Sequence, residues 1–154
     1  MKILNNIFLG KKILIYGLGK SGISSYSFLK NRSKVYLFDD NHKLNLKLNQ
    51  KIISLKEIQK INFDIIIISP GIDISNCKLS KFLKKNLFKI HTDLDVLFSF
   101  YDNTSITITG TNGKSTTAKI LHDVLIDQKR DSRLVGNIGN PVLSEKNITK
   151  KTIF

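Results

Sequence analysis

Short apolar runs alternate with amphipathic stretches along the first two-thirds of the chain. The four isoleucines at 65–68 are typical of a strand in a parallel sheet that is covered on both faces. Apolar residues also recur at helical spacing, as in Ile23, Tyr26 and Leu29. The predicted strands are residues 12–16, 35–38, 64–69 and 88–90, and the predicted helices are 21–30, 54–60, 79–86 and 93–100. This alternation predicts an α/β fold with a Rossmann-like, doubly wound parallel sheet.

Two local patterns add detail to these elements. Ser54 and Glu57 have the spacing of a capping box, which predicts that a helix begins there. In the helix at 93–100, Leu94, Leu97 and Phe98 are expected to face inward.

A polar stretch at 101–104 interrupts the pattern and predicts a domain boundary. Residues 105–109 then predict a new strand, and 133–135 predict another. The intervening helix is predicted at 116–128, with an apolar face formed by Ala118, Leu121, Val124 and Leu125. We therefore expect one domain at 1–103 and, at 104–154, the beginning of a second α/β domain of the P-loop type, truncated at the start of a further strand.

Composition restricts the cellular location and the kinds of binding partner that we expect. No apolar run approaches the roughly 20 residues of a membrane-spanning helix, and the N-terminal residues do not read as a signal peptide. The single cysteine, Cys77, cannot form an internal disulfide, which favours a cytoplasmic protein. The net charge of +13 comes from scattered lysines with only three arginines, without the interleaved aromatics of a nucleic-acid surface. We expect no nucleic-acid partner and no membrane insertion.

A glycine-rich loop follows the first predicted strand. Gly17, Gly19 and Gly22 form G-x-G-x-x-G at the start of a helix, where backbone amides and the helix dipole favour a phosphate. Asp39 follows at the end of the next strand, where a ribose or base contact is expected. Alone, this pattern supports a dinucleotide-binding domain. The alternative is that the glycines merely permit a tight turn.

A second loop is more specific. TGTNGKST at 109–116 stands between a predicted strand and a long helix and ends like a Walker A loop. Gly113 permits close approach of the backbone to phosphates, Lys114 faces their oxygens, and the Ser115 hydroxyl is a candidate ligand of Mg²⁺. Ile108 stands where the general motif has its first glycine. The alternative is a chance Gly-Lys-Ser at a helix start.

Two phosphate loops on successive α/β units indicate two nucleotide-bearing ligands, and the motifs together resemble the Mur ligase family, in particular its D-glutamate-adding members. The resemblance extends from residue 11 to about 142. The segments that carry it are GLGKSG at 17–22, SPGI at 69–72, DLDVLF at 93–98, TGTNGKST at 109–116 and GNIGNP at 136–141.

The resemblance implies two sites. The UDP-substrate site it implies comprises Gly19, Lys20, Ser21, Gly22, Asp39, Asp40, Pro70, Gly71 and Asn137. The ATP site it implies comprises Gly110, Thr111, Asn112, Gly113, Lys114, Ser115 and Thr116, with Lys114 and Ser115 in catalytic roles and Ser115 as a Mg²⁺ ligand. For Asn137, a loop-capping role is the alternative. The roles of Asp93 and Asp95 stay open.

The resemblance also implies a reaction. ATP phosphorylates the alanyl carboxylate of UDP-N-acetylmuramoyl-L-alanine, and the amine of D-glutamate displaces phosphate from the acyl phosphate, a step in peptidoglycan precursor synthesis. Further family metal ligands and an amino-acid-binding domain find no counterpart in 154 residues. We therefore expect this chain to be an N-terminal fragment, inactive alone, of an enzyme that is monomeric at full length. An NAD-binding oxidoreductase domain and a non-catalytic nucleotide-binding module are the alternatives.

Overall fold

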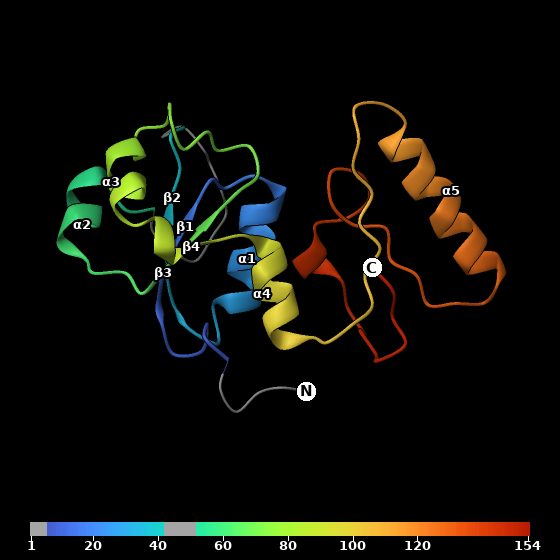
Figure 1. Ribbon diagram of the computed structural model, residues 1–154. Coiled ribbons are helices and arrows are strands. Elements are labelled where there is room, and N and C mark those ends of the chain that lie inside the picture. The colour runs from blue at the N-terminus through green and yellow to red at the C-terminus, as the bar shows by residue number, and fades with distance from the viewer. Residues whose placement is uncertain (1–5, 42–51) are drawn as a thin grey trace.

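Four parallel strands form a sheet in the order β2-β1-β3-β4 (Figure 1). The computed structural model describes residues 6–41 and 52–154. The strands are β1 Lys12–Tyr16, β2 Lys34–Phe38, β3 Ile65–Ile68 and β4 Ile90–His91. Ile13 of β1 is opposite Val35 of β2 on one side and Ile65 of β3 on the other. The predicted parallel sheet is confirmed.

Helices cover both faces of this sheet (Figure 1). On one face lie α1 Lys20–Leu29 and α4 Asp93–Phe100; on the other lie α2 Leu55–Lys60 and α3 Ser80–Lys85. Successive side chains of β1 alternate between the two faces, so Ile15 packs in the α1/α4 core and Leu14 in the α2/α3 core. The long apolar run of β3 is explained in the same way.

Capping boxes start two of the helices. The predicted one is confirmed: the Glu57 amide donates to Ser54 Oγ at 3.3 Å, and the Ser54 amide donates to Glu57 Oε2 at 2.7 Å. A second one opens α4, where the Thr92 amide donates to Asp95 Oδ2 at 2.7 Å. Asp95 therefore has a structural role at the helix start, whereas Asp93 is buried.

The orientation of α4 corrects one expectation. Leu97 faces the core as predicted, but Leu94 and Phe98 are 48% and 43% exposed. Val96 and Phe100 are buried beside Leu97 instead. The buried face of α4 is therefore formed by Val96, Leu97 and Phe100, and Phe100 packs edge-on against Phe28 of α1.

Residues 101–154 form fewer elements than predicted. The helix is present as α5 Lys114–Asp127, two residues earlier than predicted, but none of its side chains is buried. The predicted strand at 105–109 is absent: the segment pairs only through Ile106 and Thr104 with Phe154. The predicted strand at 133–135 is replaced by isolated bridges: Val135 pairs with Asn140, and the adjoining Ser132 pairs with Ile153, where the Arg133 amide donates to the Ile153 oxygen at 2.8 Å. A strand needs a continuous run of paired residues, and these segments pair only at isolated positions of the described residues.

Part of this C-terminal stretch returns to the first core. The 3₁₀-helix η2, Val142–Ser144, packs against α1 and α4, and Val142 and Leu143 are buried there. Directly before β4, a 3₁₀-helix η1, Leu87–Lys89, replaces most of the strand predicted at 88–90.

No helix within 6–41 and 52–154 has the length and apolarity to cross a membrane.

Candidate nucleotide-binding site

The first glycine loop lies at the point where the sheet changes its winding direction. The crossover from β1 to β2 runs through α1 on one face, and the crossover from β2 to β3 runs through α2 on the other. The carboxyl ends of β1 and β3 therefore meet at a topological switch point, where α/β sheets bind ligands. The Gly17–Gly22 loop follows β1 at this point, and the segment Ser69–Gly71 follows β3.

Two of the three glycines are required by packing within the protein. A Cβ on Gly22 would lie 1.9 Å from the Gly17 carbonyl oxygen, and Gly17 has a φ of +91° with a Cβ position 2.9 Å from Ser69 Cβ. Gly17 and Gly22 are therefore needed for the tight turn itself. Gly19 is different: its φ is −71°, and an added Cβ would meet no atom within 4 Å. Its open face leaves room for close approach of a ligand.

The amino end of α1 offers unused hydrogen-bond donors beside Gly19. The first helical bond runs from the Ile23 amide to the Gly19 oxygen, and no side chain caps the helix. The amides of Lys20, Ser21 and Gly22 precede that bond and have no acceptor within the helix. Lys20 is exposed and Ser21 half-buried. This combination of donors, helix dipole and an exposed ammonium suits a phosphate.

The loops after β2 and β3 are tied directly to the glycine loop. Asp39 Oδ2 accepts the Leu18 amide at 2.6 Å, and Ser69 Oγ donates to the Gly17 oxygen at 2.7 Å. The structure thus brings Gly19–Gly22, Asp39 and Ser69–Gly71 to one edge of the sheet. Pro70 and Gly71 are exposed there, and an added Cβ on Gly71 would meet no atom within 4 Å.

Asp40 belongs to a separate cluster that the sequence did not reveal. Its Oδ1 accepts the Tyr16 hydroxyl at 2.8 Å, and its backbone oxygen accepts Lys78 Nζ at 2.6 Å. Burial raises the pKa of Tyr16 well above its ordinary value, and hydrogen bonds with Cys77 and Asp40 raise it further. A buried hydroxyl at the end of an aliphatic strand was the available signal for Tyr16, because such a group needs a partner. Lys78 gave no local signal.

The second loop is formed at the start of α5. Gly110 and Gly113 have positive φ angles of +149° and +77°, so the loop conformation uses both glycines. Lys114 Nζ donates to the carbonyl oxygens of Gly110 and, at 3.0 Å, Thr111. The ammonium thus folds back over its own loop, and the hydroxyls of Ser115 and Thr116 are on exposed residues of the first helical turn.

Asn137 lies in a tight loop between α5 and η2. The Asn140 amide donates to the Leu134 oxygen at 3.2 Å, and Gly139, with a φ of +79°, leaves no room for a Cβ beside that oxygen. Asn137 is exposed at the tip of the loop. Neither Asn137 nor the Lys114 loop shares a hydrogen bond with the Gly17–Gly22 loop among the interactions of the described residues.

Comparison with known proteins decides the family. Residues 11–90, more than half of the chain, match the family model "Mur ligase MurD-like, N-terminal domain". The chain belongs to the MurD-like Mur ligase family. The matched residues include the whole sheet apart from its last residue, together with the Gly17–Gly22 loop, Asp39, Asp40 and Ser69–Gly71.

Curated relatives of this Mur ligase chain are named UDP-N-acetylmuramoylalanine–D-glutamate ligase. The protein from Rickettsia felis is 37% identical over 142 residues, which cover 88% of this chain and 31% of the relative. Those from Clostridioides difficile and Caldicellulosiruptor saccharolyticus are 34% and 31% identical and are covered over 32% and 35% of their lengths. The chain therefore spans about a third of the relatives that it matches.

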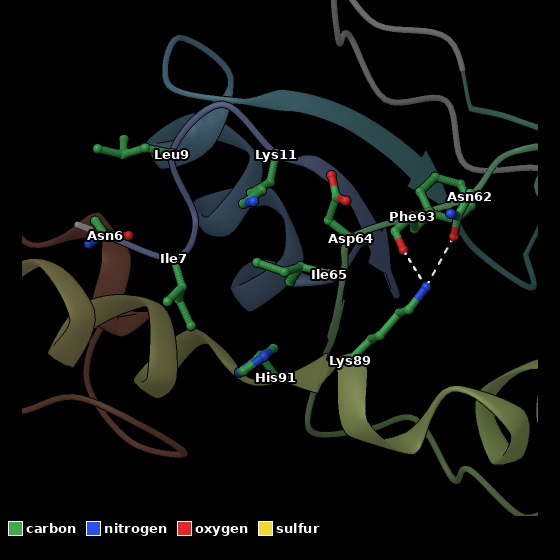
Figure 2. A pocket seen from close by; sticks show the side chains of 10 residues that line it. All are labelled: Asn6, Ile7, Leu9, Lys11, Asn62, Phe63, Asp64, Ile65, Lys89 and His91. Carbon is green, nitrogen blue, oxygen red and sulfur yellow. Dashed lines mark hydrogen bonds between the residues drawn. The ribbon is translucent and has the colours of Figure 1, made fainter.

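The Mur ligase chain also has a cavity of about 710 Å³ far from these loops, at the edge where β1 and β3 begin (Figure 2). Lys11, Asp64 and Lys89 contribute its charged groups. Two of them are already paired with the protein: Asp64 Oδ2 accepts the Lys12 amide at 2.8 Å, and Lys89 Nζ donates to the Phe63 oxygen at 2.7 Å. The cavity contains none of the predicted site residues.

Proposed function

We propose that this chain is the N-terminal part of a ligase that joins D-glutamate to UDP-N-acetylmuramoyl-L-alanine, and that it binds the UDP moiety at the carboxyl edge of the sheet. The observation that carries the proposal is the switch-point arrangement, in which the uncapped start of α1 and the open Gly19 adjoin Asp39 and Ser69–Gly71. The amides at 20–22 would hold the diphosphate, and Asp39, Asp40, Pro70 and Gly71 would surround the uridine.

The second loop is proposed to bind ATP with Mg²⁺. Gly110–Gly113 and the first-turn amides of α5 would surround the phosphates, Lys114 would exchange its loop carbonyls for phosphate oxygens, and Ser115 would ligate the metal. Among the described residues no cluster of His, Cys, Asp or Glu is arranged to hold a metal ion. In the proposal, the ligands of Mg²⁺ are the Ser115 hydroxyl and the phosphate oxygens of ATP. Thr116 would add a hydroxyl to the same turn.

The ligation itself needs more than these two loops. Phosphoryl transfer to the alanyl carboxylate relies on positioning and on neutralisation of charge, to which Lys114 contributes one positive charge. Asn137 would contact the muramoyl part of the substrate. We propose that residues 1–154 bind nucleotides but do not form the acyl phosphate, and that phosphate release stays at background with UDP-N-acetylmuramoyl-L-alanine, D-glutamate and Mg²⁺-ATP.

Two glycine variants test the first site, because an added methyl group has open space at Gly19 and none at Gly22. Gly19→Ala adds a methyl group where the protein has open space, so UDP affinity should fall roughly ten-fold or more while thermal stability falls by at most about 1 kcal/mol, the cost of a poorer N-cap. Gly22→Ala is the matched control and should lower stability strongly, because its Cβ meets the Gly17 oxygen. Unchanged UDP affinity in Gly19→Ala contradicts the proposed site, and tighter binding of NAD than of UDP by the parent favours an oxidoreductase domain.

The second site is tested with two lysines of α5. Lys114→Ala should abolish measurable Mg²⁺-ATP binding and leave the helix content by circular dichroism unchanged. Lys119→Ala removes an exposed lysine of the same helix, which pairs with Asp123 at 2.6 Å, and it should bind Mg²⁺-ATP like the parent. Equal affinities of the parent and the Lys114 variant would reduce Lys114 to a solvated residue at a helix start.

A further inference from the structure

The two adjacent aspartates after β2 make different contacts, although the sequence treats them as a pair. Asp39 uses both carboxylate oxygens on backbone amides: Oδ2 accepts from Leu18 at 2.6 Å and Oδ1 from Asn41 at 2.8 Å. Leu18 is the residue between Gly17 and Gly19, and its side chain is buried. The carboxylate of Asp39 therefore joins the glycine loop to the chain that leaves β2.

Asp40 has no such link. Its Oδ1 accepts the Tyr16 hydroxyl, and its Oδ2 accepts the Lys78 amide at 3.4 Å. These partners belong to the end of β1 and to the loop before α3, on the α2/α3 side of the sheet. Neither hydrogen bond reaches the residues between Gly17 and Gly22.

We propose that Asp39 is a positioning residue for the diphosphate loop and that Asp40 is not. This inference rests on the proposed binding of a nucleoside diphosphate at the start of α1. Leu18 lies one residue before Gly19, the N-cap of α1, so the anchor at its amide fixes the backbone from which the free amides of 20–22 project. Donors that are held in place before the ligand arrives bind it more tightly.

Electrostatics makes the proposal testable, because a positioning role and a direct effect of charge have opposite signs. A carboxylate close to a bound diphosphate repels it, so removal of the charge alone should tighten diphosphate binding. Loss of the Leu18 anchor should weaken it. In Asp39→Asn the amide group can accept only one of the two backbone N–H groups and turns a donor toward the other, so the anchor is impaired as the charge disappears.

The experiment titrates the full chain with inorganic pyrophosphate, uridine and UDP. For Asp39→Asn we expect pyrophosphate and UDP to bind roughly ten-fold more weakly, with faster hydrogen exchange of the Leu18 amide. Asp40→Asn, at a residue proposed to face the uridine, should change pyrophosphate affinity by less than about two-fold. The control outside the proposed site is Asp73→Asn, whose carboxylate accepts from Ser75 and Asn76 and whose loss should change neither pyrophosphate nor UDP affinity. Asp39→Glu keeps the charge and displaces the carboxylate by one methylene group, so it should weaken pyrophosphate binding too; this variant decides the question if Asp39→Asn fails to fold.

Three other outcomes would contradict the proposal, each at a different step. Unchanged or tighter pyrophosphate binding in the Asp39 variants, with weaker uridine binding, overturns the positioning role and makes Asp39 a direct contact of the nucleoside. An equal loss of pyrophosphate affinity in Asp40→Asn overturns the distinction between the two aspartates. If the parent protein binds neither pyrophosphate nor UDP, the proposed function itself fails, and the ligand-positioning role of Asp39 fails with it.

Discussion

The two glycine-rich loops that we propose to bind phosphates lie beside differently packed elements. The first follows a strand whose residues Ile13 to Tyr16 are fully buried between two helical layers. The second precedes α5, which has no buried side chain and leaves Ile120 and Val124 more than half exposed. Hydrogen bonds hold that region instead, such as Thr152 Oγ1 to Asp131 Oδ2 at 2.6 Å and His122 Nδ1 with Ser132 Oγ at 3.0 Å.

This difference shows what a loop motif needs from its surroundings. The first loop is fixed by contacts from two other strand ends, through Asp39 and Ser69. The second loop has its glycine conformations and its lysine, but within the described part of the chain Lys114 is held by carbonyls of its own loop alone. The local sequence is thus sufficient to shape the second glycine-rich loop, whereas hydrogen bonds from neighbouring strand ends hold the first one in place. The two regions should therefore differ in how much stability a substitution costs.

The largest effect is expected in the sheet. Ile66 is fully buried in β3 and lies opposite Leu14 and Ile90. Ile66→Ala should lower the free energy of unfolding by about 2–5 kcal/mol, because it leaves a cavity in a close-packed core. Urea denaturation followed by circular dichroism measures this change. A loss below about 1 kcal/mol would show that the sheet region is no better packed than the α5 region.

An intermediate effect is expected where the C-terminal stretch enters the first core. Val142→Ala removes two buried methyl groups from the contact of η2 with α1 and α4 and should cost about 1–3 kcal/mol. The same denaturation experiment applies, with Val135→Ala, at a half-buried position, as the milder control. Equal and negligible losses would mean that η2 does not stabilise the first region.

A smaller effect is expected at Tyr16, and it depends on pH. Tyr16→Phe removes the hydrogen bond to Asp40 and should cost about 1 kcal/mol near neutral pH. Because burial raises the folded-state pKa above the ordinary 10.0, this tyrosine stabilises the fold below pH 10 and that stabilisation is lost as the pH rises further. The parent should therefore lose more stability than the variant between pH 9 and pH 12. Parallel losses in thermal melts would contradict the raised pKa.

The smallest effect is expected on α5. Val124→Ser replaces an exposed apolar residue and should change the free energy of unfolding by less than about 0.5 kcal/mol. Faster hydrogen exchange across α5 than across β1 and β3 should accompany this tolerance. A loss comparable to that of Ile66→Ala would show that α5 is covered in solution, for instance by self-association, which sedimentation velocity would reveal.

The sequence predicted the sheet region well because its signals are local and agree with one another. Aliphatic runs, the Ser54 capping box and the glycine loop each identify an element within a few residues. The strand at 105–109 was wrong because a β-branched run does not form a strand without neighbours to pair with. Leu94 and Phe98 were placed inward wrongly because helical spacing does not determine which of two overlapping stripes meets α1.

The candidate site was predictable in its loops but not in its internal bonds. Asp39 was expected to contact a ligand, and nothing in the sequence indicated that both its oxygens are bound to backbone amides. Lys78 lies 38 residues after Asp40 and meets it only through the fold. The division of the chain at residue 103 stays a prediction, as do the individual ligand contacts.

The burial of η2 has a kinematic consequence for the second loop. The chain leaves the first core after Tyr101, which packs against it, and contacts that core again at Val135 and then at Val142 and Leu143. Residues 102–134 are therefore an excursion whose two ends contact the same core. Such a closed excursion cannot drift away from the core, and the hydrogen bonds of Ile106 and Arg133 with residues 153–154 restrain it further, so the range of distances between the two loops is bounded.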